Sequence, residues 1–369
     1  MTPMNKYRHN TYRRYKIFIQ IAKRYWYDIV KYSEKSWKHT FDIIEGITLK
    51  HNEPSYVGAY LYYGLSQLNR DLLIKSLFGK ELDMNGFQLK FGGIFVHQNP
   101  IVEVEPSNPS VKGLSRRTCE IGDLLIIFTF VDKNNVPLIN RAFLSQAKID
   151  DTPVRGAQRI LYEKDVRFRF KRPLEENIQK NSCAVTRHNR YPRRFPSRWP
   201  KSRGLKYLRL YPLEKETRLE LLDRDKFCPC LEYCYCRRPW CCNEYPFGCS
   251  IFGLMTGQDG WKFSLNPNPP LYICGWNHIM HDLITDTAHR VSTLGGLKKG
   301  KDRFNRGQYL SYLVSQFNRF ENINEHFIGM NPLDPEPPGK TESPEGPNGI
   351  NTMLIMVKDT KTESEHTQE

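Results

Sequence analysis

The stretch DLLIIFTFVDKNNVPLINRAFLSQAKI, residues 123–149, has the pattern that decides the fold class. Residues 124–131 form a strongly apolar run, and a second run covers residues 138–144. The polar residues 132–135 between the two runs suit a turn, because Asp and Asn tolerate the backbone angles that turns require. The pattern therefore predicts a β-hairpin.

The register of this hairpin determines which side chains meet at its open end. The midpoint between Asp123 and Gln146 falls between Asn134 and Asn135, so strands folded there place Asp123 beside Gln146. Lys148 projects from the same face as Gln146, because residues two apart on a strand share a face. We therefore expect a carboxylate, an amide and an ammonium group to converge at the open end.

That combination of groups suits the cleavage of phosphodiester bonds. Asp123 and the side-chain oxygen of Gln146 are ligand types for a divalent metal ion, and Mg²⁺ or Mn²⁺ is the expected ion. A metal there polarises a phosphate and lowers the pKa of a water molecule, while Lys148 orients that water or offsets charge in the transition state. The alternative is structural, since an exposed Asp and Lys at the end of a hairpin are ordinary.

Helices and strands are expected on both sides of the hairpin. Residues 10–45 predict one or two helices, and residues 55–78 predict a helix with Tyr and Leu side chains on one face. The remaining expected elements are strands at 88–96 and 101–105, and helices at 154–168, 250–257, 276–292 and 306–320. Strands flanked by helices indicate an α/β (α+β) fold.

The domain organisation is expected to follow the composition of the chain. We expect an N-terminal helical region (1–50), a core (51–172), a basic loop and strand region (173–225), a Cys-rich insertion (226–250), a C-terminal helical part of the same body (251–330) and a disordered acidic tail (331–369). The tail holds three lysines against eight acids and is rich in Pro, Gly, Glu and Thr, a composition typical of disorder.

Positive charge is concentrated outside that tail. The net charge of the chain is +15 and the tail carries −5, so residues 1–330 carry +20. Residues 180–209 hold ten basic residues and no acid, and their regularly spaced prolines predict an extended loop. This distribution favours nucleic acid over a membrane surface. The candidates for binding phosphates are Arg187, Arg190, Arg193, Arg194 and Arg198, with Trp199 or Phe195 available to stack on a base.

The order of motifs resembles the PD-(D/E)xK nuclease superfamily. In that superfamily a metal-binding Asp precedes an (E/Q)xK strand inside an αβββαβ core with a mixed sheet flanked by helices, and Asp123 with Gln146-x-Lys148 is similar to this pattern. Gln158-x-x-x-Tyr162 resembles the extra motif of the RecB-like, exonuclease-type branch, and its spacing puts both side chains on one helix face.

The resemblance covers residues 50–170 and implies a restriction-endonuclease-like core that hydrolyses DNA, often in host defence against viruses or in a restriction-like role. Residues 117–148 also resemble a group of bacterial proteins with the pattern CE-x-GDLL…QAK. The resemblance implies that Gln158 and Tyr162 support the substrate. It also implies a further acid at the metal, for which Glu120 and Glu53 are preferred over Glu103 and Glu105.

The cysteines indicate a second kind of metal site. Seven of them lie close together, at Cys228, Cys230, Cys234, Cys236, Cys241, Cys242 and Cys249. Thiolates this dense in a reducing compartment usually bind a metal, and we favour Zn²⁺ over an iron–sulfur cluster. A thiol-rich loop without metal is the alternative. Because no apolar run approaches the ~20 residues that span a bilayer, and no signal-peptide pattern is present, we expect a cytoplasmic protein.

Two other functions stay open at this point. Gln146 stands where the superfamily usually has Glu, which removes one metal-binding charge and is consistent with a degenerate nuclease fold that binds nucleic acid without cleaving it. The Cys-rich segment is consistent with an interaction protein, which leaves protein partners or a homo-oligomer open. His278, His281, Asp282 and His289 are expected on an amphipathic helix that docks on the core, in preference to a metal site.

Overall fold

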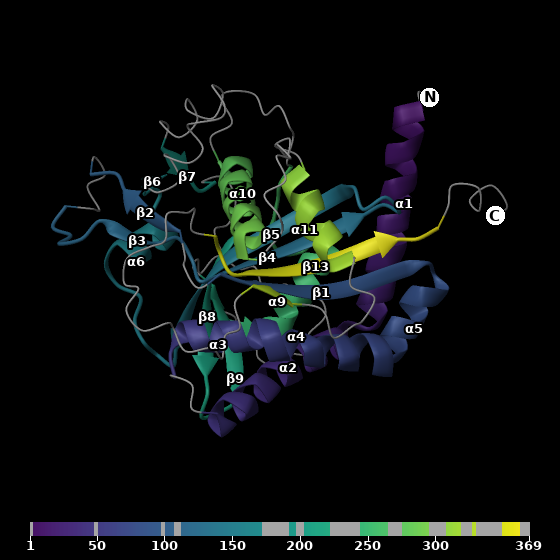
Figure 1. Ribbon diagram of the computed structural model, residues 1–369, viewed down its shortest axis with the longest axis horizontal. Helices are drawn as coiled ribbons and strands as arrows, with labels where there is room; N and C mark the ends of the chain where they lie inside the picture. The colour runs from purple at the N-terminus through teal and green to yellow at the C-terminus, as the bar shows by residue number, and fades with distance from the viewer. Residues whose placement is uncertain are drawn as a thin grey trace.

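A mixed sheet, with nine strands among the described residues, runs through the centre of the computed structural model (Figure 1). The structure describes residues 3–47, 51–96, 100–106, 112–171, 192–196, 203–221, 244–264, 275–294, 308–318, 327–329 and 349–361. The strand order is β10-β9-β8-β5-β4-β13-β1-β12, and β11 pairs with β5. The strands are β1 (Phe87–Phe95), β4 (Leu124–Val131), β5 (Pro137–Ile149), β8 (Leu205–Tyr211), β9 (Glu216–Leu221), β10 (Glu244–Pro246), β11 (Trp261–Lys262), β12 (Phe327–Gly329) and β13 (Thr352–Asp359).

The hairpin expected over residues 123–149 is confirmed as β4 and β5. The two strands pair antiparallel, and Leu124 lies opposite Ser145. Oδ1 of Asp132 accepts hydrogen bonds from two backbone amides of the turn, at 2.8 and 2.9 Å. Asn135 has a φ of 63°, a left-handed conformation that Asn tolerates better than most residues. The polar residues between the two runs therefore form the turn that their chemistry predicts.

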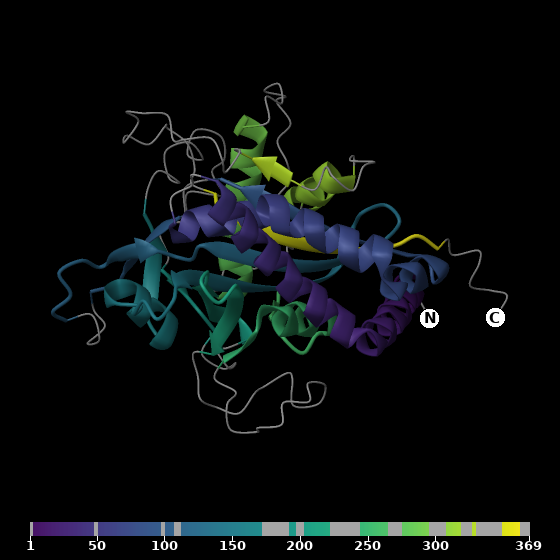
Figure 2. The same cartoon turned by 90° about the horizontal axis from the view of Figure 1, so that it is seen from below.

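Helices cover both faces of the sheet, which explains why β4 is apolar along its whole length (Figures 1 and 2). Ile126 and Phe128 face a core formed with α1 (Pro3–Arg24), α2 (Trp26–Gly46) and α9 (Phe247–Thr256). Leu125 and Ile127 face a second core formed with α6 (Gly156–Glu163), α10 (Trp276–Leu294) and α11 (Gln308–Asn318). The expected α/β class is confirmed, as a mixed central sheet flanked by helices.

The helix expected over residues 55–78 is a longer helical stretch that contains two π-helical segments. It consists of α3 (Glu53–Ala59), η1 (Tyr60–Gly64), α4 (Leu65–Leu68) and η2 (Asn69–Lys75), and α5 (Leu77–Met84) follows after Ser76. Asn52 caps its start, because its side chain accepts a hydrogen bond from the backbone amide of Ser55 (3.0 Å). Asn69 ties the stretch to β1 by accepting from the amide of Phe91 and donating to its carbonyl.

A small second sheet lies beside the open end of the hairpin. Its order is β3-β2-β6-β7, with β2 (Ile101–Val104), β3 (Thr118–Glu120), β6 (Arg167–Phe170) and β7 (Arg193–Arg194). The helix expected over residues 154–168 is wrong at its end, because α6 stops at Glu163 and residues 167–170 are a strand. The alternation Arg-Phe-Arg-Phe has the two-residue period of a strand with one buried face.

The acidic tail expected over residues 331–369 is wrong for residues 352–359. These residues form β13, which pairs parallel with β4 and antiparallel with β1 in the middle of the large sheet. The run Thr-Met-Leu-Ile-Met-Val is buried on both faces, like β4. The average composition of the segment concealed a short apolar strand between polar residues. Residues 330–348 and 362–369 lie outside the described residues.

Candidate functional site

Asp123 and Gln146 meet at the open end of the hairpin. The backbone amide of Asp123 donates to the carbonyl of Ser145 on β5 (2.9 Å). Nε2 of Gln146 donates a hydrogen bond to Oδ2 of Asp123, and the backbone amide of Ala147 donates a second to the same oxygen (2.7 Å). Both side chains are buried, with 4% of Asp123 and 1% of Gln146 exposed. Strand β5 therefore holds the carboxylate in one orientation.

The oxygen of the Gln146 amide is available for another partner. Among the described residues, the buried atom Oε1 has no hydrogen-bond partner, although buried polar atoms nearly always have one. The hydrogen bond from Nε2 to Asp123 turns Oε1 away from that oxygen. A carboxylate beside an unpartnered amide oxygen offers the oxygen ligands that Mg²⁺ and Mn²⁺ prefer. The pair therefore fits a divalent metal ion.

Lys148 connects this pair to the start of α3. Its Nζ lies 3.3 Å from Oε1 of Glu53, the first residue of that helix. The Lys148 side chain is 12% exposed and that of Glu53 is 28% exposed, so the ion pair lies at the margin of the buried site. The structure thus brings together the Lys and one of the two acids that the sequence singles out.

The electrostatics of the site favour a protonated Asp123 when no cation is bound. Burial raises the pKa of Asp123 well above its ordinary value, and the negative charge of Glu120 raises it further. Lys148 and the amide of Ala147 lower the pKa, and Glu53 raises it. Glu120, at the end of β3, and Glu53 therefore both act on the Asp123 carboxyl. A divalent cation beside it would favour the charged form.

The acids do not form a complete protein cage for a metal. Within the described ranges, no three His, Cys, Asp or Glu side chains gather closely enough to hold a metal ion. A metal at Asp123 and Gln146 would therefore depend on an amide oxygen, on water and on substrate oxygens for its other ligands. That is the usual way in which Mg²⁺ binds at phosphate-processing sites, with one or two carboxylates and several waters.

Tyr162 on α6 supports the segment that leads to Asp123. Its hydroxyl donates a hydrogen bond to the carbonyl of Ile121 (2.8 Å), and its ring stacks on that of Tyr207. Burial, and then the charge of Asp123, raise the pKa of Tyr162 well above its ordinary value. Gly122 is needed for this close approach, because a Cβ there would lie 2.9 Å from the Tyr162 hydroxyl. Gln158, one turn earlier on α6, is half-buried.

Sequence reasoning missed Asn351 as a residue of the site. Its Nδ2 donates to the backbone carbonyl of Asp123 (3.1 Å), and its Oδ1 accepts from the amide of Val96 (3.0 Å). Asn351 immediately precedes β13 and ties the start of β4 to the end of β1. Its position in a stretch expected to be a disordered tail gave no sign of this role.

The predicted phosphate-binding loop is corrected at two residues. Arg193 is buried, with 6% of its side chain exposed, and its Nε lies 2.8 Å from Oδ2 of Asp282 on α10, so it is not available to a phosphate backbone. Phe195 packs in the second core and is not available to stack on a base. Arg194 is exposed and pairs with Asp165. The other members of the prediction, Arg187, Arg190, Arg198 and Trp199, lie outside the described residues.

The predicted thiolate site is corrected at one cysteine. Cys249 lies near the start of α9 and is buried among the apolar side chains of the first core. It therefore packs in the core, whereas the sequence predicted it as a metal ligand. Cys228, Cys230, Cys234, Cys236, Cys241 and Cys242 lie outside the described residues. The helix expected over residues 276–292 is confirmed as α10, with Ile279, Leu283 and Val291 in the second core.

In comparisons with known proteins, no family model, no curated protein and no solved structure matches this chain. Of the helices whose residues the structure describes, none combines the length and the apolar character that crossing a membrane requires.

Proposed function

We propose that the protein is a metal-dependent nuclease that hydrolyses phosphodiester bonds, with DNA as the favoured substrate. The observation that carries the proposal is the buried contact between Asp123, immediately before β4, and Gln146 on β5. Among the described residues the amide oxygen of Gln146 has no hydrogen-bond partner, and Lys148 follows two residues later on β5. A role in host defence or restriction is the biological part of the proposal and rests on the resemblance alone.

The arrangement of elements around the pair supports the proposal of a PD-(D/E)xK core. The helical stretch from α3 precedes β1, the hairpin β4–β5 follows, and α6 leads on to β8, which pairs parallel with β5. This matches the order helix, three strands, helix, strand. One feature departs from it: β13 lies between β1 and β4 in the sheet. The small sheet supplies additional strands beside the site.

Each side chain of the site has a task in the proposed reaction. Asp123 and Oε1 of Gln146 would hold a Mg²⁺ or Mn²⁺ ion, which supplies Lewis-acid polarisation of the phosphate and acidifies a water molecule. The water gives up a proton to solvent as its oxygen bonds to phosphorus, the bond from phosphorus to the leaving oxygen breaks, and that oxygen takes up a proton from solvent. Lys148 orients the water or offsets negative charge on the phosphate. Glu53 orients the Lys148 ammonium, and Tyr162 keeps the segment before Asp123 in place.

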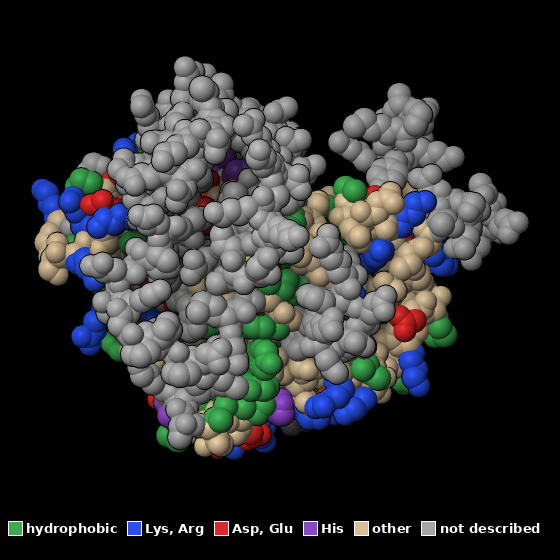
Figure 3. Space-filling view, viewed as in Figure 1, with side chains coloured by type: hydrophobic (Ala, Val, Ile, Leu, Met, Phe, Trp, Pro, Cys, Tyr) green, Lys and Arg blue, Asp and Glu red, His purple; other side chains and the backbone are tan. Residues whose placement is uncertain are grey.

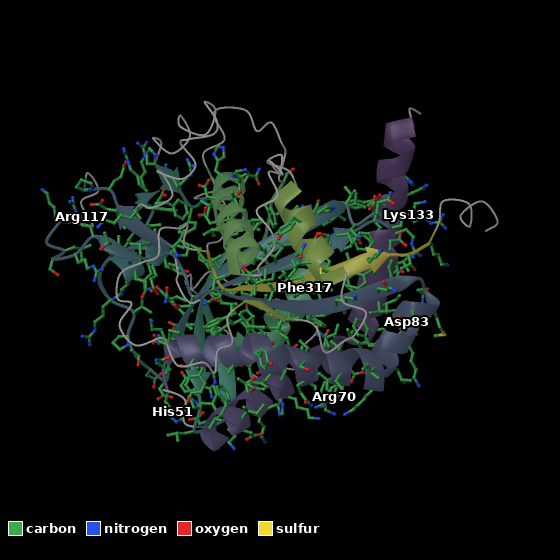
Figure 4. All side chains as sticks on the ribbon, in the orientation of Figure 1. His51, Arg70, Asp83, Arg117, Lys133 and Phe317 are labelled. Carbon is green, nitrogen blue, oxygen red and sulfur yellow. The ribbon has the colours of Figure 1, made fainter. Side chains whose placement is uncertain are left out.

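The experiment is a cleavage assay on duplex DNA, single-stranded DNA and RNA, with and without Mg²⁺ or Mn²⁺. We expect cleavage that requires metal, and a loss of about 100-fold or more in Asp123→Ala and Lys148→Ala. Lys133→Ala is the matched control, because Lys133 is exposed in the turn at the other end of the hairpin, well away from the site (Figure 4). Absence of metal-dependent cleavage, or equal cleavage by all four proteins, would contradict the proposal.

A second candidate function is nucleic-acid binding without cleavage. The observation that favours it is that position 146 provides a neutral amide, while burial and Glu120 raise the pKa of Asp123 and so weaken it as a metal ligand. The same assay separates the two functions. Salt-sensitive binding of nucleic acid with no cleavage under either metal would favour the binding module.

A further inference from the structure

The small sheet and α6 carry a large excess of positive charge. Their described segments, residues 100–106, 112–121, 155–171 and 192–196, contain eleven Lys and Arg against five Asp and Glu. We call this surface the basic flank and define it by Arg116, Arg117, Arg159, Arg167, Arg169 and Lys171. Figure 3 shows Lys and Arg side chains gathered along the left edge, where Figure 1 places β2, β3 and α6 and Figure 4 labels Arg117.

The strand pattern of β6 turns its arginines outward. Arg167 and Arg169 are exposed, while Phe168 between them is buried in the second core. Arg167 lies directly opposite Arg194 in the pairing of β6 with β7. Like charges directly opposite each other destabilise an antiparallel pair. Asp165 offsets the charge of Arg194, whereas Arg167 has no ion-pair partner among the described residues, so Arg167 is open to an anion.

Two arginines of the basic flank pair with carboxylates that a phosphate could replace. Arg169 lies 3.3 Å from Glu105, and Arg117 lies 3.6 Å from Glu103. The pair of Arg117 and Glu103 is exposed on both sides, at 40% and 42% of the side chains, and such pairs contribute little. Arg169 is 55% exposed beside Glu105, which is 16% exposed. A phosphate offers guanidinium groups two oxygens in the geometry that they bind best. A phosphate can therefore replace Glu103 at Arg117 at little cost, and it can approach Arg169 from the exposed side of its guanidinium group.

The basic flank is built on the same elements that position the candidate site. The chain runs from Glu120 at the end of β3 to Asp123 in three residues, and the Tyr162 hydroxyl of α6 bonds to the carbonyl of Ile121 between them. A strand of nucleic acid lying along the flank would thus lie next to the pair of Asp123 and Gln146.

The aromatic side chains of the flank point inward. Tyr162, Phe168 and Phe195 are buried in the second core, and Phe170 packs against it. Proteins that recognise single strands usually present exposed aromatic side chains on which bases stack. Among the flank residues that the structure describes, most of the exposed side chains are charged. This composition suits contact with phosphates, which position a nucleic acid without reading its sequence.

We propose that the basic flank binds the phosphate backbone of a nucleic acid without reading its bases, and that it lays the strand beside Asp123 and Gln146. The binding surface follows from the flank alone, whereas the purpose of that placement rests on the proposed nuclease function. Binding is therefore tested separately from cleavage, in EDTA, so that failure of one proposal is distinguishable from failure of the other.

The test measures the binding of the full chain to fluorescein-labelled duplex and single-stranded DNA by fluorescence anisotropy. At about 100 mM salt we expect Arg167→Glu/Arg169→Glu to bind duplex about tenfold or more weakly, with a salt slope reduced by about 2. Arg13→Glu/Lys16→Glu is the charge-matched control, because both residues are exposed on α1 at the opposite side of the molecule (Figures 1 and 2). We expect the control to keep most of its affinity, and duplexes of unrelated sequence to bind equally.

Circular dichroism checks that each variant folds. If Arg167→Glu/Arg169→Glu does not fold, Arg159→Glu/Lys171→Glu replaces it, since both of these residues are exposed on the flank outside the paired strand segments. Equal loss of affinity in the flank and control variants, or affinity that depends strongly on sequence, would overturn the proposal. Binding to vesicles of anionic phospholipid in place of DNA would overturn it as well.

Discussion

The side-chain amide of Gln146 donates its Nε2 hydrogen to the carboxylate of Asp123, which leaves the amide oxygen as the free end. Gln146→Glu replaces this contact by two neighbouring carboxylates, which repel each other unless a cation lies between them. We expect the affinity for Mn²⁺ to rise by about tenfold or more, because ligand charge sets metal affinity. Titration calorimetry with Mn²⁺ measures it.

Gln158→Glu is the control for that experiment, because it makes the same change of charge on α6 at a half-buried position. We expect its Mn²⁺ affinity to equal that of the original protein. If Gln146→Glu gained no more affinity than Gln158→Glu, the pair at the open end of the hairpin would not be a metal site.

Asp286 on α10 makes stability depend on pH. Its side chain is fully buried, and neither carboxylate oxygen has a hydrogen-bond partner among the described residues. Burial raises its pKa well above the ordinary value, and the charge of Asp282 raises it further. The folded state therefore holds this proton more tightly than the unfolded state. The stabilisation is complete below the pKa of the unfolded carboxyl, and it is lost as pH rises towards the folded pKa.

Asp286→Asn removes that loss, because its amide does not titrate. We expect the free energy of unfolding of the variant, minus that of the unsubstituted protein, to increase as pH rises above about 4. The increase should be up to ~1.4 kcal/mol per pH unit. Urea unfolding at several pH values measures the gain, with Asp83→Asn as an exposed control on α5 (Figure 4). A difference that stays constant between pH 4 and 8 would contradict the buried, protonated state.

Lys206 and Asp259 form a buried ion pair on the other face of the sheet from the candidate site. Nζ of Lys206 lies 2.9 Å from Oδ2 of Asp259, with 0% and 2% of the side chains exposed, and the Tyr245 hydroxyl contacts both. Lys206→Met leaves the carboxylate buried without its cation, so we expect a loss of about 3–5 kcal/mol in the free energy of unfolding. Urea denaturation measures this loss. Lys262→Met, at an exposed position of β11, should cost much less.

β13 makes the C-terminal part of the chain essential for folding. Its removal exposes the edges of β4 and β1, takes Asn351 away from Asp123 and empties space in both cores. A chain that ends at residue 348 should therefore lose its cooperative thermal unfolding, whereas a chain that ends at Lys361 should keep it. Calorimetry of the two truncated proteins compares them, and equal melting temperatures would show that β13 is dispensable.

The hairpin and the meeting of its side chains follow from local sequence. Two apolar runs joined by an Asp- and Asn-rich turn determine which residues lie opposite each other, so the proximity of Asp123 and Gln146 was predictable. The contact between Lys148 and Glu53 was harder to predict from the sequence. Position near a helix start made Glu53 a candidate, but the ion pair depends on how α3 packs across the end of β5.

The errors arose where composition was averaged over long stretches. Residues 180–209 are rich in arginine, yet the fate of an individual arginine depends on what it packs against: Arg193 is buried against Asp282 of a distant helix, while Arg194 is exposed. The same averaging concealed β13 in an acidic segment and placed Cys249 in a thiol cluster, although it packs on the core side of α9.

The sequence by itself determined the strands and helices with strong periodicity, and the register that joins Asp123 to Gln146, because these depend on residues close together in the chain. The tertiary structure decided where distant segments meet. Asn351 reaches Asp123, Arg193 reaches Asp282 and β13 enters the sheet between β4 and β1. Such contacts depend on which apolar surfaces are buried together and which polar atoms then need partners, and neither is encoded in any single stretch of the chain.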